Sequence, residues 1–102
     1  MNIGIWGDSI TFGGGDAEAL GWVGRLRKSC FSNDGISIYN RGVCGDTTVD
    51  LIERFTAEAR SIKPDIIMFA IGINDSKFPR SKVENLVSLE DFSQNIRNLI
   101  SQ

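Results

Sequence analysis

The chain has 102 residues, of which 41% are hydrophobic and 24% are charged, a composition typical of one globular domain over residues 1–102. Thirteen acidic and eleven basic residues give a net charge of −2 without a long run of either sign, which argues against nucleic acid as a partner. The longest apolar stretch, residues 66–71, is too short to span a membrane, and the N-terminus lacks the pattern of a secretion signal, so we expect a cytoplasmic protein without a membrane anchor.

The first half of the chain predicts strand, helix and strand in turn. Residues 2–6 form a short apolar run that ends in a Gly-Asp-Ser turn, which indicates a buried strand. Three successive glycines at 13–15 indicate that residues 11–21 form a loop. From residue 21 to about 32, apolar residues recur at helical spacing, and residues 36–39 then predict a second strand between turn-forming residues.

The second half predicts helix, strand and helix. A helix with a capping-box pattern at Thr47 carries a regular apolar stripe and ends at Pro64. The nearly continuous apolar run at residues 65–71 is typical of a parallel strand that is covered on both faces. A polar loop containing Pro79 follows, and a second capping-box pattern at Ser88 begins the last helix.

This alternation predicts an α/β fold with a doubly wound parallel sheet of about βαβαβα order. In open parallel sheets, functional sites form outside the carboxyl ends of the strands. Each predicted strand is followed by a polar motif: Gly7-Asp8-Ser9, Gly45-Asp46-Thr47 and Gly72-Ile73-Asn74-Asp75. The fold would therefore bring together three motifs that lie dozens of residues apart.

The motifs resemble the first three sequence blocks of the GDSL, or SGNH, hydrolases. The resemblance runs in order through residues 7–11 (GDSIT), 40–48 (NRGVCGDTT) and 72–75 (GIND), and it covers only the first half of the family's fold. It implies a three-layer flavodoxin-like fold that is truncated at the C-terminus. It also implies an esterase or lipase that hydrolyses a small-molecule carboxylic ester through an acyl-serine intermediate, with no cofactor and no metal.

The resemblance assigns catalytic roles to Ser9, Gly45 and Asn74. Ser9 would be the nucleophile, and the oxyanion hole would consist of the backbone N–H groups of Ser9 and Gly45 together with the side-chain amide of Asn74. The residue types suit these roles, because a serine at the end of a strand exposes its hydroxyl and an amide side chain donates without titrating. Taken singly, Gly45 could equally serve a backbone turn, and Asn74 could cap local backbone.

Other residues near the motifs receive structural interpretations. Three aspartates are interpreted as acceptors for backbone amides in turns and loops: Asp8, Asp46 and Asp75. Three aromatic residues are interpreted as core or loop packing rather than an acyl pocket: Trp6, Phe12 and Phe78. Cys30 and Cys44 are expected to be free thiols, and a cysteine nucleophile at Cys44 is disfavoured because no histidine is present to activate it.

The chain departs from the family pattern in one respect that matters for catalysis. Members of the family carry an Asp-x-x-His near the C-terminus, whereas this sequence contains no histidine. Two interpretations follow: a hydrolase that is inactive alone and is completed by a missing C-terminal half, or a module without catalysis that binds an acyl or carboxylate group. In either case the apolar strand at residues 65–71 would lie at a sheet edge, so we expect homo-oligomers, or pairing of that edge with the missing half.

Overall fold

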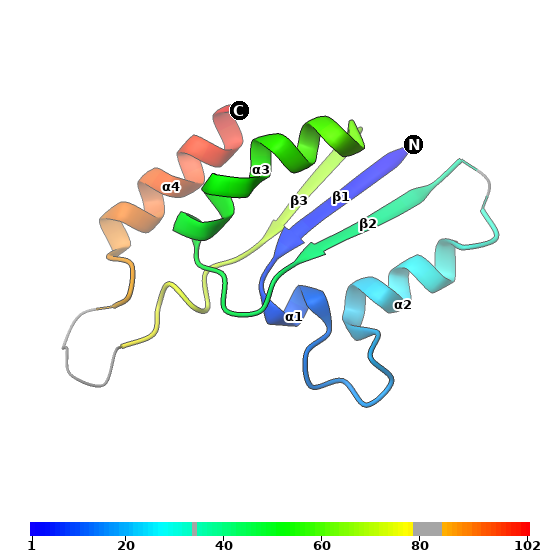
Figure 1. Ribbon diagram of the computed structural model, residues 1–102, viewed down its shortest axis with the longest axis horizontal. Coiled ribbons are helices and arrows are strands. Elements are labelled where there is room, and N and C mark those ends of the chain that lie inside the picture. Colours follow the sequence, from blue (N-terminus) through cyan, green and yellow to red (C-terminus); the bar gives the residue numbers. More distant parts are fainter. Residues whose placement is uncertain (34, 79–84) are drawn as a thin grey trace.

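The computed structural model describes residues 1–33, 35–78 and 85–102, so the predicted loop at Pro79 lies outside the described residues. Figure 1 shows a single sheet of parallel strands with helices packed around it. The elements in chain order are β1 (Asn2–Gly7), α1 (Ser9–Phe12), α2 (Gly21–Cys30), β2 (Ser37–Gly42), α3 (Thr48–Ile62), β3 (Ile66–Ala70) and α4 (Leu89–Ser101). The α/β architecture agrees with the prediction from the sequence.

The sheet has the strand order β2-β1-β3, with β1 in the centre and both neighbours parallel to it. The predicted edge position of the third strand is therefore confirmed. The register places Ile5 of β1 beside Asn40 of β2 and Met68 of β3. Because residues in register project to the same side of a sheet, the side chains of Ile5 and Met68 share one face.

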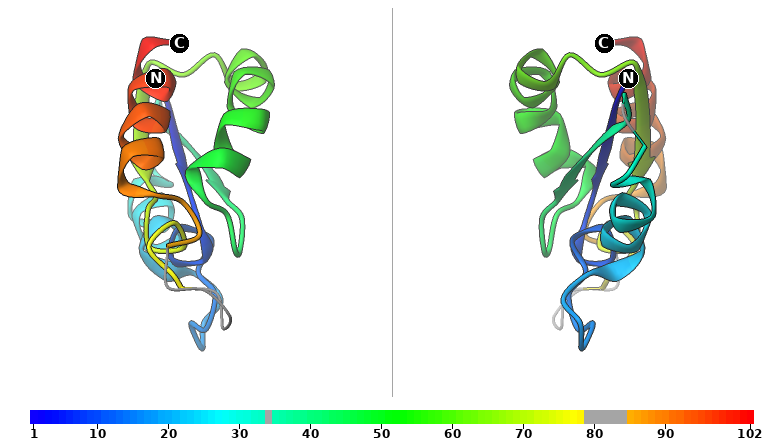
Figure 2. Two further views of the ribbon diagram at one scale, coloured as in Figure 1. Left: turned by 90° about the vertical axis from the view of Figure 1, so that its left-hand side faces the viewer. Right: turned by 90° about the vertical axis from the view of Figure 1, so that its right-hand side faces the viewer.

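The central strand β1 supplies the core on both faces of the sheet. Ile5 is fully buried with Val23 of α2 and Ile38 of β2 on one face. On the other face, Trp6 is fully buried against α3 and α4, and its ring lies 4.9 Å from the ring of Phe55. Figure 2 accordingly shows α2 and α3 on opposite sides of the strands.

The helix starts follow the capping signals in the sequence. At the start of α3, the Thr47 backbone N–H donates to Asp50 Oδ2 over 2.9 Å and the Asp50 N–H donates to Thr47 Oγ1, which confirms the capping box. The helix ends at Lys63, which is in the left-handed conformation with φ 52°. At the start of α4, Ser88 Oγ accepts from the Asp91 N–H over 3.1 Å, so the predicted N-cap is present.

The predicted loop over residues 11–21 begins later than expected. Residues 9–12 form one helical turn, α1, because the Asp8 carboxylate accepts from the Ile10 N–H over 3.0 Å and caps the turn. Gly13, with φ 97°, then ends the turn. The short turn was not evident from the sequence because four residues show no helical periodicity.

The prediction that β3 is covered on both faces is wrong. Ile66, Ile67 and Met68 are each more than 40% exposed. On the face shared with Ile5, α2 packs over the side of the sheet that holds β2, and β3 extends beyond this cover. The apolar run does form a strand of a parallel sheet, but the described residues do not cover it on both faces.

Candidate active site

Hydrogen bonds join the three polar motifs at the carboxyl ends of the strands. The Val43 N–H, just after β2, donates to the Gly7 carbonyl at the end of β1 over 3.1 Å. The Asn74 side-chain amide, which follows β3, donates to the Asp46 carbonyl over 2.9 Å. The fold thus brings together the segments that carry Ser9, Gly45 and Asn74, as the positions of the motifs predict.

Ser9 is the first residue of α1 and lies at the point where β1 becomes a helix. The segment is fixed from both sides, because the Phe12 N–H donates to the Asp8 carbonyl over 3.0 Å and the Gly14 N–H donates to the Ser9 carbonyl over 2.8 Å. Gly42 of β2 packs closely against it: a Cβ at position 42 would lie 2.3 Å from the Phe12 nitrogen. Glycine at the end of β2 is therefore required for this close approach.

Gly45 lies in an exposed loop with a left-handed backbone, at φ 85°. This conformation is a sufficient structural reason for glycine at this position. A Cβ built at this residue would meet no atom within 4 Å, so the space beside the backbone is open. The position suits an amide that contacts a ligand, and its role as an oxyanion donor stays a prediction.

Asn74 is only 4% exposed, and its side-chain nitrogen is held by the Asp46 carbonyl. An amide nitrogen carries two N–H groups, so this bond orients the side chain and leaves the second N–H for another acceptor. Asn74 thus has the fixed geometry that an oxyanion donor needs, although its catalytic role stays a prediction.

Asp75 anchors the segment after β3 to the start of α3. Its carboxylate is 2% exposed and accepts from the Thr48 N–H at 3.1 Å and from Thr48 Oγ1 at 2.5 Å. Asn95 of α4 donates to the same hydroxyl over 3.0 Å. The interpretation of Asp75 as an acceptor for backbone amides is confirmed, and the bond spans 27 residues of sequence.

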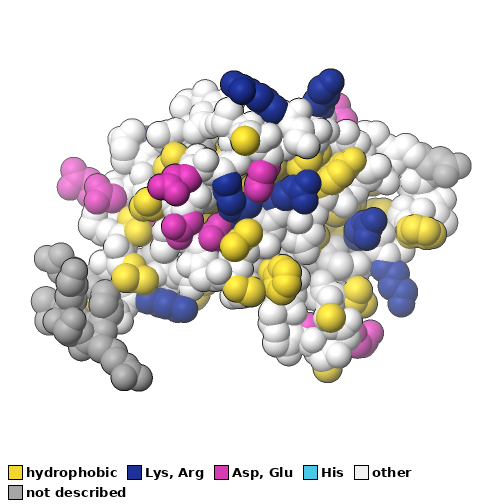
Figure 3. Space-filling view, in the orientation of Figure 1, with side chains coloured by type: hydrophobic (Ala, Val, Ile, Leu, Met, Phe, Trp, Pro, Cys, Tyr) yellow, Lys and Arg dark blue, Asp and Glu magenta, His cyan; other side chains and the backbone are white. Residues whose placement is uncertain are grey.

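The interpretation of Asp46 as an acceptor for backbone amides is wrong, because its side chain accepts from Arg54 of α3 instead. The Arg54 Nε lies 2.8 Å from Asp46 Oδ2. Figure 3 shows acidic and basic side chains next to one another over α3. The sequence signal for Arg54 was its spacing of four residues from Glu58, which by itself indicates only a helix-surface pair.

Burial raises the pKa of the Asp46 carboxyl above its ordinary value, and the hydrogen bond and charge of Arg54 act in the opposite direction. The Asp46 carboxylate is thus partly shielded from water, and Arg54 provides the positive charge that stabilises it. Removing that cation would leave the charged form of Asp46 poorly stabilised.

The packing interpretation is confirmed for Trp6 only, because the side chains of Phe12 and Phe78 are more than half exposed, and the two cysteines are free as expected. Trp6 lies in the core, whereas Phe12 and Phe78 are exposed loop or helix-end residues. Cys30 and Cys44 are free. Among the described residues, no helix is long and apolar enough to cross a membrane.

Comparisons with known proteins identify the family. The family model of the GDSL-like lipase/acylhydrolases matches residues 5–102. The chain is 33% identical to an acetylxylan esterase of Geobacillus stearothermophilus over 110 aligned positions, which cover 92% of this chain and 50% of that protein.

Solved structures give the same result. The chain resembles the lipase/acylhydrolase of Enterococcus faecalis with a TM-score of 0.77 and 27% identity over 98% of this chain and 50% of that one. It resembles the SGNH-hydrolase family esterase AlinE4 with a TM-score of 0.77 and 25% identity over 98% of this chain and 51% of that one. The chain spans about half the length of these relatives. With almost all of its residues matched, the chain belongs to the GDSL-like lipase/acylhydrolase family.

Proposed function

We propose that the chain carries the nucleophile and oxyanion half of an ester hydrolase, with Ser9 as the nucleophile. Its hydroxyl would attack the carbonyl carbon of a carboxylic ester, release the alcohol and leave an acyl-Ser9 intermediate that water then hydrolyses. The observation that carries the proposal is the hydrogen-bonded convergence of the segments bearing Ser9, Gly45 and Asn74 at one end of the sheet.

The oxyanion of the tetrahedral intermediate would be met by the Ser9 and Gly45 amides and by the second N–H of Asn74. These donors belong to three separate segments, and buried hydrogen bonds fix two of those segments against each other. Fixed donors need no reorganisation as charge develops, and one such donor contributes about 3 to 4 kcal/mol of barrier lowering in acyl-transfer enzymes.

The general base would have to come from outside these residues, because the 102-residue sequence contains no histidine. A serine hydroxyl without a base is a poor nucleophile. The open edge of β3, which lies next to the segment carrying Asn74, is the place where we infer that a further polypeptide strand pairs. The same lack of histidine favours a second candidate function, in which the donors bind an acyl or carboxylate group without turnover.

The test is hydrolysis of p-nitrophenyl acetate by the 102-residue chain and by its Ser9→Ala variant, each with and without added imidazole. Without imidazole we expect background rates in both proteins. Because free imidazole can accept the proton that Ser9 must lose, we expect a rate in the wild-type chain that rises with imidazole above the rate in Ser9→Ala.

Free imidazole also cleaves this ester directly, and the Ser9→Ala sample measures that contribution. Replacing the exposed Ser29 of α2 by alanine is the matched control and should leave the rate unchanged. If the hydrolysis rate rises equally with imidazole concentration in the wild type and in Ser9→Ala, Ser9 is excluded as the nucleophile. Saturable shifts of the Gly45 and Asn74 amide signals with acetate would then support the binding function.

A further inference from the structure

Arg54 of α3 lies outside the three polar motifs, but its side chain bonds three segments at the carboxyl end of the sheet. Its guanidinium donates through Nε to Asp46 Oδ2 over 2.8 Å. Through Nη2 it donates to the Gly7 carbonyl over 3.3 Å and to the Arg41 carbonyl over 3.0 Å. One side chain from α3 therefore contacts the end of β1, the end of β2 and the loop after β2.

These contacts lie directly beside two residues of the candidate site. Gly7 precedes Ser9 by two positions, and Asp46 follows Gly45 in the chain. A planar guanidinium presents its donors in a fixed fork, so the positions of these acceptors relative to one another are set by one rigid group. Gly45 itself is exposed, with open space beside its backbone, and the loop is also held by the bonds from Val43 to Gly7 and from Asn74 to Asp46.

The guanidinium is itself anchored to the core. Arg54 Nη1 donates to Glu58 Oε1 over 2.6 Å, and the indole N–H of the buried Trp6 donates to the same oxygen over 3.2 Å. The Arg54 side chain is 20% exposed, so water has limited access to these bonds. The ion pairs of Arg54 with Asp46 and with Glu58 thus connect the Gly45 loop to Trp6, the most buried aromatic residue of the protein.

We propose that Arg54 is a positioning residue that holds the Gly45 amide in a fixed place relative to Ser9. The proposal deepens the proposed function, since Gly45 is the donor whose placement would matter for the oxyanion. Arg54 would act indirectly, through its bonds to the Asp46 carboxylate and to the carbonyls of Gly7 and Arg41.

The experiment compares Arg54→Met, Arg54→Lys and Arg60→Met by the backbone amide NMR signals of the full chain. In Arg54→Met we expect the Gly45 and Asp46 amides to shift and their exchange with solvent to accelerate at least tenfold. Lysine keeps the positive charge but lacks the planar fork of donors, so we expect the Gly45 and Asp46 amides of Arg54→Lys to behave nearly as they do in Arg54→Met. Arg60, which is exposed on the same helix, is the matched control and should leave both amides unchanged.

A Gly45 amide that keeps its shift and exchange rate in a folded Arg54→Met protein would overturn the proposal. If Arg54→Met does not fold, as judged by circular dichroism, the same measurement on Arg54→Lys decides. The second readout is the imidazole-dependent, Ser9-dependent rate, for which we expect at least a tenfold loss in kcat with little change in KM. A wild-type chain without any such rate would refute the proposed function, whereas the Gly45 amide would still decide the role of Arg54.

Discussion

The carboxyl ends of the strands and the outer edge of β3 belong to one sheet, yet the fold completes them to different degrees. At the strand ends, the buried polar side chains of Asp8, Asn74 and Asp75 all have hydrogen-bond partners. Along β3, the exposed side chains are apolar, and the strand contains no charge or proline that would discourage pairing with another chain. The acidic and amide side chains of the polar end are thus paired, although the buried Thr11 Oγ1 and Arg41 Nε have no partner among the described residues, whereas the apolar edge of β3 is left uncovered.

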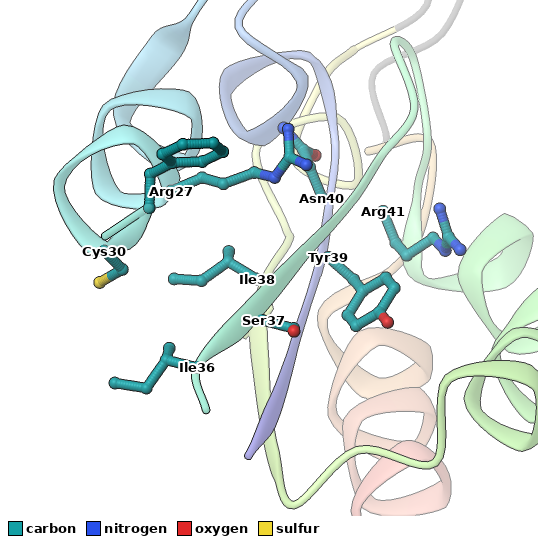
Figure 4. A pocket seen from close by; sticks show the side chains of 9 residues that line it. Arg27, Cys30, Ile36, Ser37, Ile38, Tyr39, Asn40 and Arg41 are labelled. Atoms are coloured by element: carbon teal, nitrogen blue, oxygen red, sulfur yellow. The ribbon is translucent and has the colours of Figure 1, made fainter. Parts of the chain in front are cut away.

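The opposite edge of the sheet shows that an edge can be protected. Figure 4 shows that β2 has Tyr39 and Arg41 on one side, while Arg27 reaches from α2 toward Asn40. The Arg41 guanidinium lies 5.9 Å from the centre of the Tyr39 ring. Charged residues along an edge strand oppose strand addition. The two edges therefore differ in chemistry, and β3 is the one suited to receive another strand.

The largest effect on stability is expected at the polar end, for Asp75→Ala. The substitution leaves the Thr48 N–H and hydroxyl without their acceptor in a buried place. An unsatisfied buried donor costs about 1 to 3 kcal/mol, so two of them should lower the free energy of unfolding by about 3 kcal/mol. Urea unfolding followed by tryptophan fluorescence, to which the buried Trp6 and the more exposed Trp22 both contribute, measures this loss.

The control for this variant is Glu53→Ala, which removes an exposed carboxylate from α3. We expect a change within about 0.5 kcal/mol, as is usual for surface positions. Asp75→Asn, which keeps one acceptor oxygen, should lie between the two. Similar stabilities for Asp75→Ala and Glu53→Ala would show that the strand ends do not depend on the buried contact.

The second effect concerns association and not stability, and it tests the β3 edge. The wild-type chain should self-associate at several hundred micromolar, because an unpaired apolar edge invites strand pairing. Met68→Lys places a charge on this edge at a position that is 42% exposed, so it should weaken association at least tenfold while the chain stays folded. Sedimentation equilibrium gives the average mass of each protein against the 11.2 kDa of one chain.

Phe31→Lys is the matched control, since Phe31 is 85% exposed and directly follows α2 rather than lying on β3. It should associate as the wild type does. A wild-type chain that stays monomeric at the highest concentration, or an equal effect of the two lysines, would contradict the role of β3.

The fold was largely predictable because its signals are local. The capping box at Thr47, the end of the helix before Pro64 and the apolar run of β3 depend on residues close in sequence. The convergence of the segments that carry Ser9, Gly45 and Asn74 followed from the rule for parallel sheets. What could not be predicted involves long-range partners: Asp75 bonds Thr48 27 residues away, and Arg54 reaches Gly7 47 residues away.

The exposure of β3 was missed for the same reason. An apolar run indicates that a strand is suited to burial on both faces, but the covering layers come from other segments. The sequence therefore shows that Ile66 and Met68 are suited to burial. In the structure, α2 covers this face of the sheet over β1 and β2 and leaves β3 exposed.

The smallest effect is expected at Asp16, whose carboxylate, like that of Asp75, accepts several hydrogen bonds but is only partly buried. Its carboxylate accepts from Arg25 at 3.1 Å and from the Leu20 and Gly21 amides at 2.9 and 3.1 Å. The Arg25 hydrogen bond, followed by the two amides, lowers the pKa of Asp16 from 3.8 to about 2. A lowered folded-state pKa stabilises the protein above pH 3.8, and this contribution is lost as the pH falls toward about 2.

Arg25→Gln should therefore raise the pKa of Asp16, because it removes the first of these causes. The value should stay below 3.8, since the two backbone amides remain. Titration of the Asp16 carboxyl carbon by NMR measures the change, and Arg27→Gln, on the same helix, should leave the pKa at about 2. If Arg25→Gln leaves it there as well, the backbone amides alone hold the carboxylate. The Arg25 side chain is 47% exposed, so water screens its ion pair with Asp16. We therefore expect Arg25→Gln to change the pKa of Asp16 with a much smaller effect on stability than Asp75→Ala has at the buried strand ends.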